Sequence, residues 1–208
     1  MANKKTVIVT GFEPFGEHAV NSSWVAVQEL EQLGLGETVD LYVYEVPVEY
    51  QAVRSLLLSL WNQHKPQVFK ELQNTLAVHV GVSGSATAVT LEQYGHNNGY
   101  KRPDNRAFSP ASQCCIENGP DCISSVLDMD TVCKRVSDSD IGVAVSVSND
   151  AGSYLCDYTY YMSLYRGEGH SAFVHVPPLE KPYCSKDLGR ALQAVIQEML
   201  NLLERDCA

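Results

Sequence analysis

Apolar residues recur along the chain in two patterns that alternate. Short apolar runs typical of buried strands occur in "KTVIVT" (5–10), "VDLYVYEV" (39–46), "LAVHVGV" (76–82), "IGVAVSVS" (141–148) and "SAFVHV" (171–176), and "TAVTLE" (87–92) is expected to be extended. Apolar residues spaced three or four apart predict helices over Trp24 to Leu33, Val53 to Trp61, Met129 to Val136 and Leu188 to Leu202. This alternation predicts a three-layer α/β/α sandwich around a mainly parallel, twisted sheet.

Composition is consistent with one packed unit. The chain has 208 residues, of which 45% are apolar and 19% charged, so we expect a single domain over 1–208 with a full core. Residues 95–120 are rich in Gly, Asn, Pro and Cys and are expected to form a long loop. Asn21 or Ser22 is expected to cap the first helix.

Charge and motif content exclude several kinds of partner. A net charge of −10 makes nucleic acid an unfavourable partner, and no basic run or long apolar segment predicts contact with a membrane. The N-terminus lacks the features of a secretory signal, so we expect a cytoplasmic protein whose seven cysteines are mostly reduced. Because no C-x-x-C pair and no phosphate-binding glycine motif occur, we expect neither a metal nor a cofactor.

Cys156 is a candidate nucleophile in "NDAGSYLCDYTYYMSLY" (149–165). It follows a strand and a glycine turn, and it falls in the first turn of a predicted helix, where unpaired N–H groups and the helix dipole favour a thiolate. Asp157 is expected to help cap this helix. The alternative is that Cys156 is a buried structural thiol, since free cysteines are often buried.

His175 and Glu92 are the candidate base and its partner. His175 ends the strand in "FVHVPP", and Glu92 ends "TAVTLE". The carboxyl ends of parallel strands meet at one edge of a sheet, where an imidazole can activate a thiol and a carboxylate can orient the imidazole. His96 is a weaker rival base. The alternatives are a core histidine and a surface glutamate.

Two phenylalanines stand in the loop "TGFEPFG" (10–16). Phe12 and Phe15 either fill the core or form the wall of a pocket.

Four separated stretches together resemble the pyroglutamyl-peptidase I family of cysteine peptidases, in its animal form: "TGFEPFGEHAVNSSW", "HVGVSGSATAVTLE", "SNDAGSYLCDYTYY" and "FVHVPP". The resemblance runs over almost the whole chain. It implies a cytosolic exopeptidase that removes N-terminal pyroglutamate from peptides through a thioester. By their place in the family motifs, Cys156 is implied as the nucleophile, His175 as the base and Glu92 as the residue that orients it.

The resemblance also implies a pocket for the lactam ring. Its walls correspond to Phe12, Phe15, Tyr154 and Leu155, with Asn21 as a polar candidate for the lactam edge. This chain departs from the family pattern in "VFKELQNT" (68–75), which carries additional residues before a strand, and at Gln93, where a basic residue is common. We expect the additional residues to form a longer loop at the end of the sheet opposite the site.

Two other functions remain open on the sequence. One is a non-catalytic homologue or impaired variant that binds N-terminally blocked peptides. The other is a cysteine amidase that acts on small lactams or amides.

Overall fold

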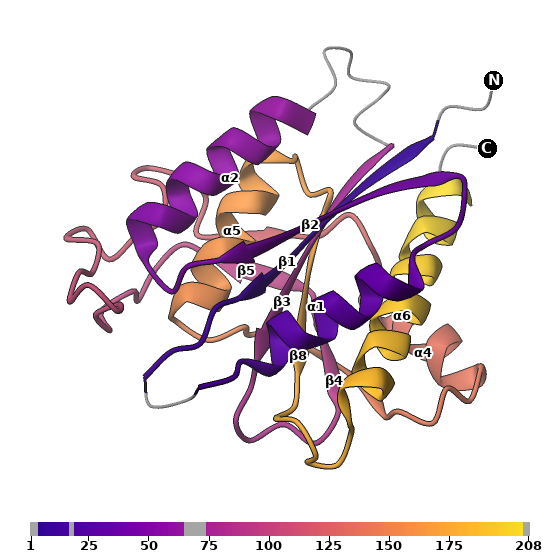
Figure 1. The fold of residues 1–208 in the computed structure, drawn as a ribbon. Coiled ribbons are helices and arrows are strands. Elements are labelled where there is room, and N and C mark those ends of the chain that lie inside the picture. Colours follow the sequence, from indigo (N-terminus) through magenta and orange to yellow (C-terminus); the bar gives the residue numbers. More distant parts are fainter. Residues whose placement is uncertain (1–3, 17–18, 65–73, 206–208) are drawn as a thin grey trace.

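A computed structural model describes residues 4–16, 19–64 and 74–205. Its main sheet has six strands in the order β2-β1-β3-β8-β4-β7 (Figure 1). These strands are β1 (Lys5–Phe12), β2 (Val39–Val46), β3 (Thr75–Val82), β4 (Val89–Glu92), β7 (Val145–Ser148) and β8 (Ser171–Val176). Each pair of neighbours is parallel except β4 and β8, which are antiparallel. The predicted fold class, α/β with a mainly parallel sheet, is confirmed.

Helices cover both faces of this sheet (Figure 1). On one face lie α1 (Ser22–Leu33), α4 (Met129–Asp138) and α6 (Ser185–Arg205), and on the other lie α2 (Tyr50–His64) and α5 (Leu155–Arg166). Each face therefore has its own apolar core: a largely aliphatic one under α1, α4 and α6, and an aromatic one under α2 and α5. A two-stranded ribbon, β5 (Tyr94–His96) with β6 (Cys122–Ser124), pairs the two ends of the region expected to be loop, 95–120.

The strand predicted over 141–148 is shorter than expected, because β7 begins only at Val145. Asp140 and Gly142 both have positive φ, 49° and 74°, which a regular strand does not adopt. Of the segment 68–75 that carries the additional residues, residues 68–73 lie outside the described residues. β3 begins at Thr75, so this segment joins the strand at its N-terminal end.

The expectation that the strands before Glu92 and Cys156 run parallel to the strand of His175 was wrong. β4 and β7 run opposite to the other four strands, so Glu92 and the strand before Cys156 do not end at the edge where β8 ends. A four-residue strand with Gly-rich flanks carries no signal for its direction, which is decided by which neighbour it pairs with. Glu92, His175 and Cys156 nevertheless lie together, because β4 pairs with β8 and α5 begins beside them, as described below.

The start of α1 is packed directly on the end of β1. Asn21 caps the helix through its side chain, which accepts a hydrogen bond from the Ser23 N–H (3.0 Å). The Ser23 hydroxyl accepts from the Phe12 N–H (3.0 Å). At Gly11, an added Cβ would lie 2.8 Å from Trp24 Cα and 2.9 Å from the Ser23 carbonyl oxygen. Only glycine therefore allows this contact between two main chains.

We predict that Gly11→Ala lowers the free energy of unfolding by about 2 kcal/mol, because the methyl group meets backbone that can move only with the whole helix. Urea unfolding followed by circular dichroism measures the change. Gly84→Ala is the control, since no atom lies within 4 Å of its added Cβ and its φ is not positive. Equal unfolding midpoints for the two variants would contradict the proposed contact.

Candidate active site

A buried hydrogen bond joins β4 to β8. Glu92 Oε1 lies 2.8 Å from His175 Nδ1, and the two side chains are 3% and 11% exposed. Thr90 is directly opposite His175 in the antiparallel register, and Glu92 is two residues further along β4. Opposed residues of an antiparallel pair point to the same face, as do residues two apart, so the carboxylate reaches the imidazole diagonally.

Cys156 approaches the same point from α5. It is the second residue of the helix, after Tyr154 as N-cap, and no side chain caps this end. Gly81 of β3 pairs with His175 in the parallel register. A Cβ added to Gly81 would lie 2.8 Å from Cys156 Sγ and 2.8 Å from Phe173 Cζ, so the thiol sits directly over this glycine, beside the imidazole. Glu92, His175 and Cys156 therefore come together.

The protonated form of His175 is favoured at this position. Burial by itself disfavours the charged ring, but the hydrogen bond and charge of Cys156, followed by those of Glu92, outweigh it and raise the pKa of His175 to about 10. The second oxygen of Glu92, Oε2, is buried and has no hydrogen-bond partner among the described residues. The arrangement can hold a thiolate–imidazolium pair with a carboxylate behind it.

Asp157 does not cap α5 as expected. It is fully buried and accepts hydrogen bonds from the His96 N–H (3.1 Å) and the Tyr100 hydroxyl (2.8 Å), so it ties the helix to the 96–100 segment. Burial raises the pKa of Asp157 to about 6, against the opposing effect of these hydrogen bonds. The folded chain thus retains a proton that the unfolded chain releases, so this group's contribution to stability falls as the pH rises from about 4 to 6.

His96, the rival base, belongs to this second cluster. Its Nδ1 atom is 3.8 Å from Asp157 Oδ1, whereas the hydrogen bond to Glu92 is made by His175.

A cavity of about 240 Å³ opens on Cys156. We call it the Phe12 cavity; it is lined by Phe12, Phe15, Asn21, Val48, Val82, Gly84, Arg102, Tyr154, Leu155 and Cys156. All five residues that the resemblance implied for the ring pocket are present. The sequence did not single out Arg102, whose guanidinium carbon lies 4.5 Å from the centroid of the Tyr154 ring.

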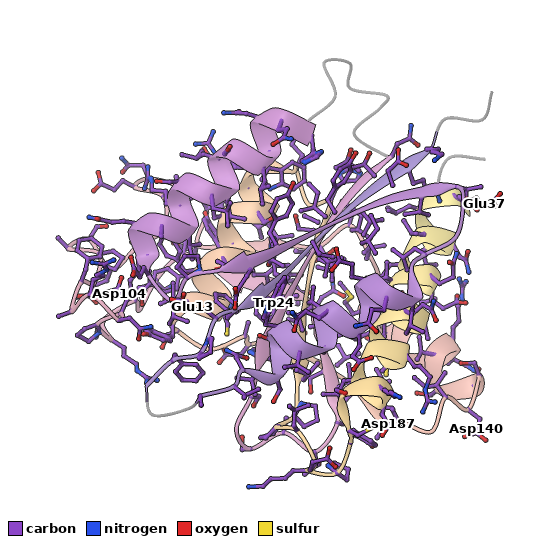
Figure 2. All side chains as sticks on the ribbon, in the orientation of Figure 1. Glu13, Trp24, Glu37, Asp104, Asp140 and Asp187 are labelled. Atoms are coloured by element: carbon purple, nitrogen blue, oxygen red, sulfur yellow. The ribbon has the colours of Figure 1, made fainter. Side chains whose placement is uncertain are left out.

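Asn21 and Tyr154 are both held in place by hydrogen bonds. The Asn21 amide oxygen accepts from the N–H and the hydroxyl of Ser23, and its nitrogen donates to the Glu13 carbonyl (3.0 Å). One amide hydrogen of Asn21 is left for a ligand. The Tyr154 hydroxyl donates to the Pro103 carbonyl (3.1 Å), which fixes the ring as a wall. Glu13 lies near the start of α1 in Figure 2.

A second cavity, of about 360 Å³, opens on His175. We call it the Asp150 cavity; it is lined by Val82, Ser83, Thr90, Glu92, Ser148, Asp150, Ala151, Gly152 and His175. A larger cavity of about 620 Å³ lies between α2 and the 108–117 segment and contains none of the three candidate catalytic residues. The three candidate catalytic residues therefore border the Phe12 and Asp150 cavities and not this larger one.

Gln93 has a structural role. Its amide nitrogen donates to the Ser125 and Leu127 carbonyls (3.3 and 3.0 Å), and its oxygen accepts from the Met129 N–H at the start of α4 (2.9 Å). A basic side chain could supply the donors but not the acceptor. The departure from the family pattern is thus accommodated outside both cavities.

The described cysteines are all free thiols: Cys114, Cys115, Cys122, Cys133, Cys156 and Cys184. Cys207 lies outside the described residues. Burial raises the pKa of the Cys115 thiol well above its usual range, which makes it a poor nucleophile. Among the described helices, none has the length and apolar character needed to cross a membrane.

Comparison with known proteins identifies the family of this chain. The family model described as pyroglutamyl peptidase matches residues 5–197. Pyroglutamyl-peptidase 1 of Rattus norvegicus is 63% identical over 202 residues, which cover 97% of this chain and 93% of the relative. The protein of the same name from Homo sapiens is 62% identical over the same shares.

Solved structures show the same fold. Pyrrolidone carboxyl peptidase from the thermophilic, keratin-degrading bacterium Fervidobacterium islandicum AW-1 has a TM-score of 0.82 and 27% identity, with 97% of this chain and 99% of that chain covered. Both the sequence match and the structural match extend over nearly the whole length. This chain therefore belongs to the pyroglutamyl peptidase family.

Proposed function

We propose that this protein is a cysteine exopeptidase that removes N-terminal pyroglutamate from small peptides, with Cys156 as nucleophile, His175 as acid and base, and Glu92 as the residue that orients His175. One observation carries the proposal: the thiol that borders an apolar, aromatic cavity lies beside an imidazole bound to a buried carboxylate. Family membership supports the same activity.

The reaction follows from these positions. The Cys156 thiolate attacks the carbonyl carbon that links pyroglutamate to the next residue, and N–H groups at the uncapped start of α5 stabilise the oxyanion. The carbon–nitrogen bond breaks as protonated His175 gives its proton to the leaving amine. Neutral His175 then takes a proton from water, the hydroxide attacks the thioester, and pyroglutamate leaves as the thiolate is restored.

The Phe12 cavity suits a lactam ring. Phe12 is almost fully buried, and Phe15 and Tyr154 are partly buried, so a flat ring between them is shielded from water. A cyclised N-terminus carries no ammonium, so it avoids the several kcal/mol that an unpaired charge would cost in such a slot. Phe12, Phe15, Tyr154 and Leu155 form the walls, and Asn21 offers its remaining amide hydrogen to the lactam.

The free thiols of the described cysteines fit a reducing compartment, and we propose that the protein acts in the cytoplasm.

The test of the nucleophile is Cys156→Ala. It removes the attacking atom, so hydrolysis of a fluorogenic pyroglutamyl amide should fall at least about 10³-fold while the circular dichroism spectrum is unchanged. Iodoacetamide should label Cys156 first in the wild-type protein. Continued turnover by the variant, or faster labelling of Cys114, would assign the nucleophile elsewhere. A protein that only binds blocked peptides would show no turnover in the wild type.

Variants of His175 and Glu92 should lose activity to different extents. His175→Ala should lower kcat about 10³-fold or more, since both proton transfers are lost. Glu92→Gln should retain part of the activity, because the amide oxygen can still accept from the imidazole. Removing the carboxylate charge lowers the His175 pKa from about 10, so the alkaline limb of kcat/KM should move to lower pH. A pH profile identical to that of the wild type would contradict the orienting role of Glu92.

Ring recognition is tested by Phe12→Ala and Phe15→Ala. Each removes apolar contact worth about 1–3 kcal/mol, so KM for a pyroglutamyl amide should rise roughly tenfold, with a smaller change in kcat. Prolyl, glutamyl and glutaminyl amides should be poor substrates of the wild-type protein. If both variants keep the wild-type KM, or if prolyl amides are cleaved as well as pyroglutamyl ones, these side chains serve only the core.

A further inference from the structure

Each of the two cavities at the catalytic pair includes a different member of the pair. The Phe12 cavity includes Cys156 and the Asp150 cavity includes His175, while Val82 borders both. In the proposed reaction, Cys156 attacks the carbonyl carbon and His175 protonates the amine nitrogen of the same bond. With the ring in the Phe12 cavity, the chain beyond that nitrogen must therefore leave toward His175 and enter the Asp150 cavity.

The lining of the Asp150 cavity is hydroxylic and acidic. Ser83, Thr90 and Ser148 supply hydroxyl groups, and Glu92 and Asp150 supply carboxylates. Among the described residues, no lysine or arginine lines it. The cavity thus differs in character from the aromatic one across the catalytic pair.

The two carboxylates differ in their burial and in their hydrogen-bond partners. Glu92 is 2% exposed, with Oε1 on His175 and Oε2 buried without a hydrogen-bond partner among the described residues. Asp150 is at the exposed rim, where its Oδ1 accepts from the Gly152 N–H (2.9 Å) and its own N–H donates to the Ser148 hydroxyl (3.1 Å). These bonds fix the direction of the Asp150 carboxylate, and within the described ranges it has no cationic partner.

An arginine near the catalytic pair borders the other cavity. Arg102 lines the Phe12 cavity and stacks on Tyr154, so it is not among the residues that face the Asp150 carboxylate. The net charge of −10 adds a negative background to the whole surface.

We propose that the Asp150 cavity binds the residue that follows pyroglutamate, and that Asp150 selects a cationic side chain, lysine or arginine, at that position. This inference rests on the proposed function and names its substrate class. A lysine or arginine side chain is long enough to reach a rim carboxylate while its stem lies in the cavity. An acidic side chain there would meet two carboxylates, and the cation in the lining, protonated His175, is already paired with Cys156 and Glu92.

The experiment compares pyroglutamyl-lysyl, pyroglutamyl-glutaminyl and pyroglutamyl-glutamyl amides by kcat/KM at low ionic strength. For the wild-type protein we expect the kcat/KM of the lysyl substrate to exceed that of the glutaminyl one roughly two- to fivefold, with the glutamyl substrate slowest, as for an ion pair with an exposed carboxylate. The lysyl preference should shrink in about 0.5 M salt, where the screening length is only a few ångströms.

Asp150→Asn is the matched variant, because asparagine keeps the oxygen that accepts from Gly152 and removes only the charge. It should bring the lysyl-to-glutaminyl ratio close to one. The control is Asp140→Asn, which makes the same charge change before β7. Figure 2 shows Asp140 on the side of the molecule away from Asp104 and Glu13. The lysyl-to-glutaminyl ratio of this variant should equal that of the wild type.

A wild-type ratio near one, or an Asp150→Asn ratio equal to that of the wild type, would overturn the inference. Calorimetry with Cys156→Ser measures the affinity for each of the three amides, and so gives a lysyl-to-glutaminyl ratio of affinities. If no substrate is turned over by the wild-type protein, the proposed function fails, and the affinity ratio still decides whether Asp150 selects a cation.

Discussion

The site depends on one antiparallel pairing in an otherwise parallel sheet. Because β4 runs against β8, Glu92 stands diagonally across from His175 on the same face, at hydrogen-bonding distance. Side chains alternate between faces with a period of two, so a register shift of one residue would move the carboxylate to the opposite side of the sheet. The contribution of Glu92 to the charge of the imidazole, which adds to that of Cys156, depends on this pairing, and so does the place of Glu92 in the lining of the Asp150 cavity.

The thiol reaches the imidazole through a separate element, and its position is set by packing. α5 is buried along most of its length in the aromatic core, and Gly81 provides the space into which Cys156 Sγ fits. The helix start carries no side-chain cap, and Asp157 instead connects it to the His96 and Tyr100 segment. Tertiary contacts, rather than local capping, therefore hold the nucleophile in place.

Much of this could be predicted from the sequence. Strong periodicity located the helices and the strands over 39–46 and 171–176, and the local contexts of Cys156, His175 and Glu92 marked them as candidates. The directions of β4 and β7 could not be predicted, since a short strand is oriented by its partners. Arg102 and Asp150 were also missed, because their importance lies in which cavity they border, and loop residues carry no periodic signal for that. The capping role expected of Asp157 failed because burial beside Tyr100 outweighed its local preference.

The wall of the Phe12 cavity is also the joint between β1 and α1. Phe12 gives its N–H to Ser23, Asn21 caps the helix, and Gly11 allows the two main chains to touch. Substitutions that reshape the ring pocket on this side therefore act on the packing of α1 against β1 as well. Changes in substrate preference on the ring side are therefore coupled to the stability of the fold, whereas the exposed Asp150 side chain, which accepts its hydrogen bond within its own turn, can change with less effect on the packing.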